Sequence, residues 1–178
     1  KANELATLCK VNTEFICCDV YGLPQQLDKK FDIVFTSYGT IGWLPDIDKW
    51  AKVVSYFLKP KGRFVFAEFH PVVWMFDDNF NTIDYRYFNS EAIVENQTET
   101  YTDQKKPIEQ TCVSWNHGLG EVVTSLLKND IQLNSLEEFD YSPYDCFEGT
   151  VEVAPKKFRI KRLDNKIPMV YAISASKQ

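Results

Sequence analysis

Residues 31–70 read FDIVFTSYGTIGWLPDIDKWAKVVSYFLKPKGRFVFAEFH and carry the clearest pattern in the chain. Residues 31–37 form a continuous apolar run, which favours a strand that is covered on both faces. Asp46 is placed to cap a helix whose apolar residues recur along one stripe. Residues 59–62, KPKG, end that helix, and residues 63–69 form the next strand. A strand, a helix and a strand in this order predict a right-handed crossover in a parallel sheet.

The same alternation continues on both sides of this unit. Residues 2–9 have helical spacing, and residues 15–20 read as a short buried strand that ends in an acidic residue. A helix is expected over 119–128, with strands over 131–139, 158–163 and 169–175. Because no linker or repeat divides the chain, we predict a single α/β domain over 1–178.

Residues 71–115 interrupt the alternation and are dense in aromatic side chains. Two short stretches alternate in polarity, over 83–88 and 111–115, so we expect an antiparallel insertion that lies over one end of the sheet. Two interpretations stay open: a loop-rich cap that completes the core, or a lid over a substrate. The density of aromatic residues favours the lid.

Composition excludes several kinds of partner. The net charge of −5 and the pI of about 5.1 would repel a phosphate backbone, so we expect no nucleic acid. No apolar run reaches the length of a bilayer, so we expect no membrane partner. The five cysteines include the adjacent Cys17 and Cys18 and no Cys-x-x-Cys pair. We therefore expect buried, reduced thiols and a cytoplasmic location.

In their order and spacing, these elements resemble the class I S-adenosylmethionine-dependent methyltransferases. The match runs from FDIV at 31–34 through SYG at 37–39 and WLPD at 43–46 to LKPKGRFV at 58–65. In that family this series is the fourth strand, the loop that faces cofactor and substrate, the next helix, and the turn into the fifth strand. The late helix and the strands at 131–139 and 169–175 resemble the family's final helix and its antiparallel sixth and seventh strands. The resemblance implies a Rossmann-like sheet with an aromatic-rich antiparallel insertion.

One part of the family pattern would have to lie before Ala2. It comprises the first strand, a Gly-rich loop, the first helix and the second strand, which grip the methionine and ribose of the cofactor. Gly118 and Gly120 have the Gly-x-Gly letters, but they precede the late helix instead of following a first strand. We therefore expect a sheet that is incomplete at the N-terminus, in a chain that is either a fragment or has lost the family function.

The resemblance also implies which residues contact the cofactor, S-adenosylmethionine. Asp19 stands where the family places an acidic residue beside the adenine amino group, and Val20 follows it. Ser37 and Tyr38 belong to the loop that faces the cofactor. The alternative for Asp19 is a carboxylate that caps the next turn.

Three tryptophans are expected to contact the substrate. Trp43 is placed to close over it or to set a ring face near the sulfonium, and it is equally placed to pack as a staple before the capped helix. Trp74 and Trp115 belong to the aromatic insertion.

Glu68 and His70 are the expected catalytic residues. They end the strand over 63–69, and alternation puts both on the same side. His70 is suited to take a proton from an oxygen or nitrogen acceptor, and Glu68 is suited to orient it or the substrate. With His117 they would also form a two-histidine, one-carboxylate set for non-haem iron. Structural histidines are favoured instead, because the ligands lack helical or hairpin spacing, and no metal site is predicted.

The expected function is S-adenosylmethionine-dependent methyl transfer to a small molecule enclosed by the insertion. Such a reaction needs orientation and a dry pocket, so the lack of a catalytic triad does not argue against it. The alternative is a non-catalytic binding or scaffold module that keeps the fold and has lost the cofactor. Because an incomplete sheet exposes apolar edges, we also expect a homo-oligomer or a rearranged strand.

Overall fold

The computed structural model describes residues 1–97 and 109–178. Helices and strands alternate as far as β2, and the rest of the described chain is mostly strands with the single helix α4; three short 3-10 turns are labelled η1 to η3. Their bounds are α1 Ala2–Leu8, η1 Val20–Gly22, α2 Leu23–Gln26, β1 Phe31–Thr36, η2 Ile41–Trp43, α3 Ile47–Phe57, β2 Leu58–Phe69, η3 Val73–Met75, β3 Ile93–Gln97, β4 Gln110–Ser114, α4 Leu119–Lys128, β5 Ile131–Phe139, β6 Thr150–Ala154, β7 Lys157–Ile160 and β8 Val170–Lys177.

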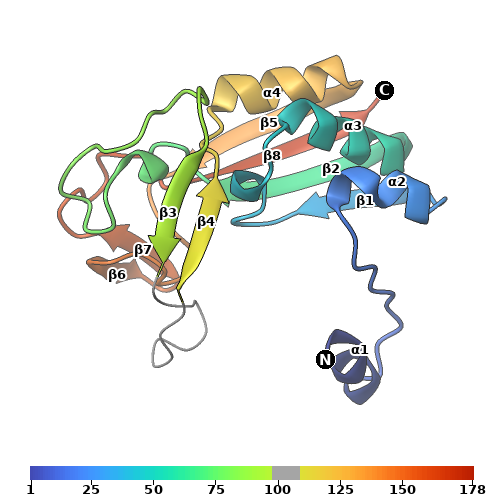
Figure 1. Ribbon diagram of the computed structural model, residues 1–178, viewed down its shortest axis with the longest axis horizontal. Coiled ribbons are helices and arrows are strands. Elements are labelled where there is room, and N and C mark those ends of the chain that lie inside the picture. Colours follow the sequence, from blue (N-terminus) through green and yellow to red (C-terminus); the bar gives the residue numbers. More distant parts are fainter. Residues whose placement is uncertain (98–108) are drawn as a thin grey trace.

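The main sheet has the order β1-β2-β8-β5 (Figure 1). β1 and β2 are parallel, with Thr36 opposite Phe66, as the crossover pattern predicted. β8 is antiparallel to both β2 and β5, so the last strand of the chain lies between two earlier ones. The predicted strands over 31–37, 63–69, 131–139 and 169–175 are therefore confirmed, with shifts of a few residues at their ends.

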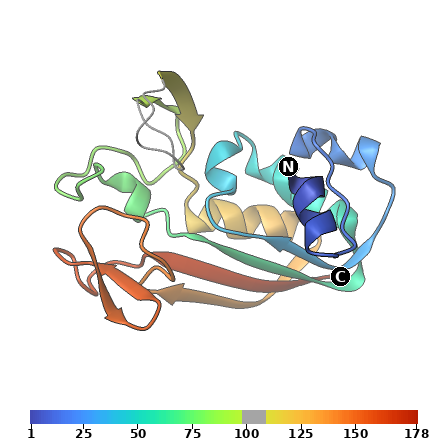
Figure 2. The same cartoon turned by 90° about the horizontal axis from the view of Figure 1, so that it is seen from below.

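Helices α3 and α4 cover one face of this sheet (Figure 2). Alternation along β2 directs Phe64 and Phe66 onto Trp50 of α3, and all three side chains are buried. Leu126 of α4 completes the same core. Asp46 caps α3 as predicted, because its Oδ1 accepts a hydrogen bond from the Lys49 N–H at 2.9 Å.

The opposite face of β1 and β2 carries an apolar strip, which we define as Ile33, Phe35 and Val65. These side chains are 51%, 62% and 37% exposed. The expectation that β1 is covered on both faces is therefore wrong for the described residues. The reason is topological: the helices that follow β1 and β2 both pack on the same side of the sheet.

The N-terminal residues differ from the prediction in one respect. The helix over 2–9 is confirmed as α1, but residues 15–20 form no strand and their side chains are largely exposed. A strand needs a neighbour to supply its ladder of hydrogen bonds, and this segment instead runs away from the sheet (Figure 1). The expectation that Cys17 and Cys18 are buried is wrong for the same reason.

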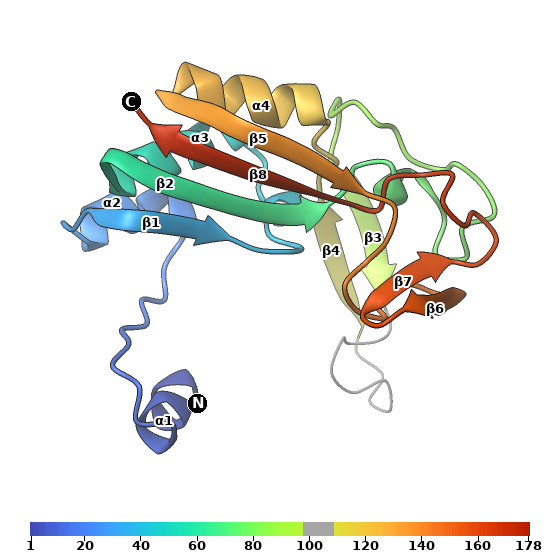
Figure 3. The same cartoon turned by 180° about the vertical axis from the view of Figure 1, so that it is seen from behind.

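Two hairpins lie beyond the carboxyl ends of β1 and β2 (Figure 3). β3 and β4 pair antiparallel, which confirms an antiparallel insertion within 71–115, although residues 98–108 lie outside the described residues. The stretch over 83–88 forms no strand and makes only an isolated bridge from Ile83 to Phe76. β7 corresponds to the strand expected over 158–163, and its partner β6 was not predicted. Within the described part of the chain, no helix is long and apolar enough to cross a membrane.

We expect the 178-residue chain to self-associate through the apolar strip, because burial of such side chains releases water from apolar surface. Phe35→Glu should lower the association constant at least about tenfold. Val153→Glu changes an exposed apolar residue of β6 and should have little effect. Sedimentation velocity over a range of concentrations measures this, and a monomer at all concentrations for the unmodified chain would contradict the expectation.

Candidate functional site

The carboxyl ends of β1 and β2 lie side by side and bring two loops together. Residues 37–40 follow β1, and residues 70–72 follow β2. In open α/β sheets, ligands bind at this edge because the loops there are free to carry functional side chains. The site is therefore assembled from these two loops and the segments that pack on them.

Glu68 fixes the loop after β1. Its side chain is buried, and each carboxylate oxygen accepts hydrogen bonds from backbone N–H groups. Oε1 accepts from Gly39 at 2.6 Å and Phe69 at 2.8 Å, while Oε2 accepts from Thr40 at 2.8 Å and Ile41 at 3.3 Å. Such a cluster of donors fits an ionised carboxylate.

Two opposing effects act on the pKa of Glu68. Burial raises this pKa above its ordinary value, and the hydrogen bonds from the backbone lower it. We hold the group to be ionised, because all four contacts are donors that a carboxylic O–H would oppose. Glu68 therefore brings a negative charge beneath the loop.

The loop itself needs a glycine. Gly39 has a φ of +71°, in the left-handed region that side chains with a Cβ rarely adopt. This turn directs the N–H groups of residues 39–41 back toward Glu68. Thr40 adds a bond from its hydroxyl to the Ser37 carbonyl, which leaves Ser37 exposed at the edge of the sheet.

His70 is buried and contacts Glu138 of β5, not Glu68. The Val72 N–H donates to its Nδ1 at 3.1 Å, which assigns the proton to Nε2, and Nε2 donates to the Glu138 carboxylate at 2.9 Å. Burial lowers the pKa of His70, while Glu138 raises it in part, with a net lowering. His70 is thus a neutral imidazole with both nitrogens engaged. The expectation that Glu68 orients His70 is not met, because both Glu68 oxygens are held by the backbone.

Asp19 caps the turn η1. Its Oδ1 accepts a hydrogen bond from the Tyr21 N–H at 2.9 Å, which is the alternative weighed for this residue. Tyr21, which sequence reasoning missed, ties the turn to α3: its hydroxyl donates to the Asp46 carbonyl and accepts from the Asp46 N–H. The Asp19–Val20 turn is therefore fixed relative to the helix that follows the loop after β1.

The three tryptophans do not gather at one point. Trp43 lies exposed on η2, and the Trp115 N–H donates to the neighbouring Gly42 carbonyl at 2.8 Å. Trp74 packs elsewhere, with its ring 5.6 Å from that of Phe69. Their expected contact with a substrate stays a prediction.

His117 joins the insertion to the loop before α3. Its Nε2 donates to the Leu44 carbonyl at 2.8 Å, and Nδ1 lies 3.1 Å from Glu121 and 3.2 Å from the Asn89 amide nitrogen. Glu68, His70 and His117, the three residues of the possible iron site, thus have different hydrogen-bond partners. Residues 1–97 and 109–178 contain no group of three histidine, cysteine or acidic side chains arranged to hold a metal ion.

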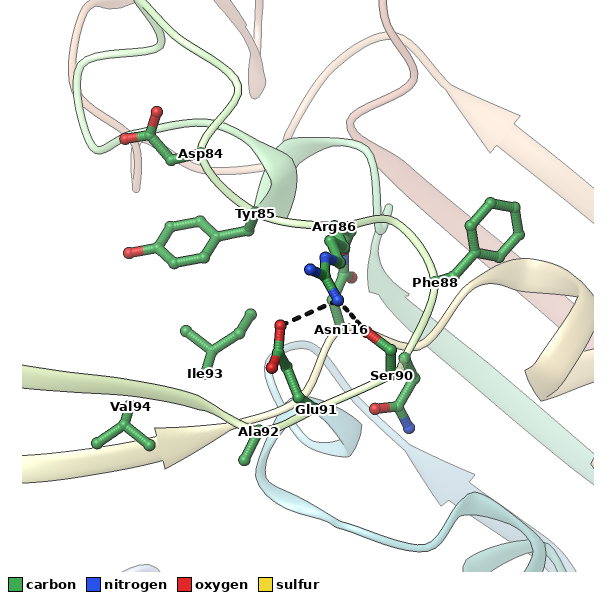
Figure 4. Close-up of a pocket in the computed structure, with 11 residues that line it drawn as sticks. Asp84, Tyr85, Arg86, Phe88, Ser90, Glu91, Ala92, Ile93, Val94 and Asn116 are labelled. Atoms are coloured by element: carbon green, nitrogen blue, oxygen red, sulfur yellow. Dashed lines mark hydrogen bonds and ion pairs between the residues drawn. The ribbon is translucent and has the colours of Figure 1, made fainter.

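Residues of the insertion and Asn116 line an open pocket of about 320 Å³ (Figure 4). Arg86 lines this pocket, with Nη1 bound to Glu91 at 3.1 Å and to the Ser90 hydroxyl at 3.1 Å. Asn116 lines it and donates to the carbonyls of Pro71 and Arg86, both at 3.0 Å. The insertion is therefore fastened to the loop after β2 from its inner side.

No family model matches the chain, and no curated protein matches it. Solved structures do match. A candidate S-adenosylmethionine-dependent methyltransferase from Listeria monocytogenes is 19% identical at a TM-score of 0.52, with 84% of this chain and 62% of that chain covered. An S-adenosylmethionine-dependent methyltransferase from Clostridium acetobutylicum is 15% identical at a TM-score of 0.61, with 99% and 69% covered. The PH0226 protein from Pyrococcus horikoshii is 16% identical at 0.53, with 99% and 65% covered.

The chain has the fold of a class I S-adenosylmethionine-dependent methyltransferase. It spans about two thirds of the length of these structures, from 62% to 69%. The antiparallel pairing of β5 with β8 agrees with the methyltransferase strands that the resemblance implied. At this identity the comparison establishes the fold, and the chemistry rests on the residues of the site.

Glu68→Gln should destabilise the protein by about 2–4 kcal/mol. The amide NH₂ would face backbone N–H donors that now meet a carboxylate oxygen. Glu138→Gln is the matched control, since this half-exposed residue can keep an acceptor for His70, and it should cost less than about 1 kcal/mol. Urea unfolding followed by tryptophan fluorescence measures both, and equal losses would contradict the role of Glu68.

His70 should make stability depend on pH. Its folded pKa lies below the ordinary value of 6.5, so its contribution is present above pH 6.5 and is lost as the pH falls from there through the folded pKa. Between about pH 7.5 and 5.5 the unmodified chain should lose more stability than His70→Gln, which retains a donor and an acceptor but does not titrate. Urea unfolding of both proteins at both pH values gives the difference between their losses of stability. Carboxylates that titrate in both proteins contribute equally to the two losses and cancel. Identical pH dependence would refute it.

Proposed function

We propose that this chain forms part of an enzyme that transfers a methyl group from S-adenosylmethionine to a small molecule. The observation that carries the proposal is the loop after β1, which Glu68 holds at the carboxyl edge of a sheet with the methyltransferase strand order. A segment after β1 that is held by three hydrogen bonds from its backbone N–H groups to Glu68 is preorganised, so ligand binding does not require the further entropy cost of ordering it.

The residues present fit the adenine half of the cofactor. Asp19 uses Oδ1 for the turn and would accept a hydrogen bond from the adenine amino group, beside the backbone of Val20. Ser37 and Tyr38 would border the cofactor from the loop that Glu68 fixes. In this proposal Asp19 offers the acceptor that the adenine amino group requires.

When bound, S-adenosylmethionine supplies a methyl group on a cationic sulfonium: a bond from the acceptor to the methyl carbon forms as the carbon–sulfur bond breaks, and a neutral thioether leaves. The chain supplies orientation and a site for the acceptor proton. His70 is neutral because burial lowers its pKa, and it would take that proton at Nδ1 after the Val72 N–H moves away. Glu68 acts as a positioning residue through the loop.

The tryptophans and the insertion bound the acceptor in this proposal. The Trp115 backbone N–H is bound to Gly42, next to Trp43, while Trp74 packs on Phe69 at the end of β2, and the β3–β4 hairpin extends beyond the edge of the sheet. The alternative, a non-catalytic module with this fold, predicts the same architecture without affinity for the cofactor.

Calorimetric titration with S-adenosylhomocysteine separates the two functions. Binding is expected for this chain or, where the gene encodes residues before Lys1, for the longer chain. Asp19→Ser should weaken binding about tenfold, because serine can still cap η1 but removes the charged acceptor.

Asp28→Ser is the matched control, since Asp28 is an exposed aspartate that follows α2, whereas Asp19 precedes η1. It should leave the affinity unchanged. Absence of binding by both the chain and its longer form would refute the methyltransferase proposal and leave the non-catalytic module.

A further inference from the structure

An aromatic cluster lies next to the loop after β1 and is formed by segments distant in the sequence. Phe69, at the end of β2, is 6% exposed and forms its floor. Three rings stand around Phe69, with centroid distances of 5.6 Å for Tyr38, 5.6 Å for Trp74 and 5.9 Å for Tyr144. We call these four residues the aromatic platform.

Three ring pairs of the platform meet edge to face, and Tyr38 is tilted by 49° against Phe69. The interplanar angle is 85° between Phe69 and Trp74, 69° between Phe69 and Tyr144, and 83° between Tyr38 and Tyr144. Rings set at steep angles present π faces in several directions, which is how proteins surround an alkylated ammonium group.

The outer rings of the platform are exposed to solvent. Trp74 is 41% exposed and Tyr144 is 43% exposed. Phe147 supports both the floor and one wall from below, with its ring 5.0 Å from Phe69 and 5.8 Å from Trp74. Large aromatic side chains that are braced yet half-exposed at the ligand edge of a sheet are available to a ligand.

The local charge favours a cation. Glu68 lies directly before Phe69 and accepts a hydrogen bond from its N–H. Burial is the main cause that raises the pKa of Tyr38 and of Tyr144, followed by Tyr141 for Tyr38 and Cys146 for Tyr144, and the negative charge of Glu68 raises the pKa of both further. The pKa of Tyr144 reaches about 12, so its phenol stays protonated near neutral pH. A negative carboxylate close to electron-rich rings attracts positive charge and repels anions.

We propose that the aromatic platform binds the ammonium group of a small amine. The assignment of this amine as the methyl acceptor rests on the proposed function. The bound ammonium group first releases a proton to solvent, which frees the lone pair of its nitrogen. The neutral nitrogen then gains positive charge as it bonds to the methyl carbon and the carbon–sulfur bond breaks, and a remaining proton passes to His70 or solvent. Ring faces and Glu68 stabilise the developing charge more than the neutral amine, which is the requirement for acceleration.

Tetramethylammonium tests the platform without any cofactor. Its methyl protons give a single line in proton NMR spectra, and tert-butanol is a neutral probe with similar methyl groups. We expect tetramethylammonium to bind with an upfield shift from the ring faces and at least about fivefold more tightly than tert-butanol. Equal affinity for the two probes, or no binding of tetramethylammonium, would overturn the proposal, and this comparison needs no variant.

Variants locate the binding. Tyr144→Leu and Trp74→Leu should each weaken tetramethylammonium about threefold to tenfold, while Tyr144→Phe keeps the ring and should stay within about twofold. Phe88→Leu changes a more exposed aromatic residue of the insertion and should leave the affinity unchanged. Unchanged affinity in both leucine variants would overturn the proposal. Because S-adenosylhomocysteine is titrated separately, failure of cofactor binding and failure of the platform are distinguishable.

Discussion

The interaction on which the site depends is the contact of one buried carboxylate with four backbone N–H groups. Glu68 belongs to β2, while three of the four donors belong to the loop after β1, so the contact joins two parallel strands at the edge where their loops diverge. The strands themselves are held by their ladder and by the core of α3 and α4. The loop has no such ladder, and without Glu68 its N–H groups would be left without partners inside the protein.

These four hydrogen bonds explain why Glu68 is a poor base and why it holds the loop after β1 in place. A base must have a lone pair that is free to meet a proton, and each Glu68 oxygen already accepts two hydrogen bonds. The same bonds hold its charge in place, so the field at Tyr38 and Tyr144 comes from a fixed position. Fixed charges contribute to catalysis because they need no reorganisation as the reaction proceeds.

Local sequence was sufficient for the central elements. The apolar run of β1, the Asp46 cap and the stripe of α3 each depend on neighbours in the chain, so spacing alone predicted them. Spacing along the chain could not predict contacts between residues that are far apart in the sequence. Glu138 reaches His70 from β5, and Tyr144 reaches Phe69 from the connection after β5, and no periodicity links these positions.

The failure over 15–20 has a different cause. Its residues have strand composition, but a strand is a property of a pair, and the structure offers this segment no neighbour. The absence of this strand has little effect on Asp19, which follows it. The acidic residue was predicted from its place in the family pattern, and it occupies a fixed turn through Tyr21 and Asp46 even though the strand before it is absent.

The position of β8 has a consequence for synthesis on the ribosome. β2 ends at Phe69, yet the strand that covers its second edge begins only at Val170, and β5 joins the sheet only through that strand. During translation both β2 and β5 therefore wait with open edges until Val170–Lys177 leaves the exit tunnel. Sheet closure is a late, long-range event, and the nascent chain is most exposed to misassociation in the interval before its final strand arrives.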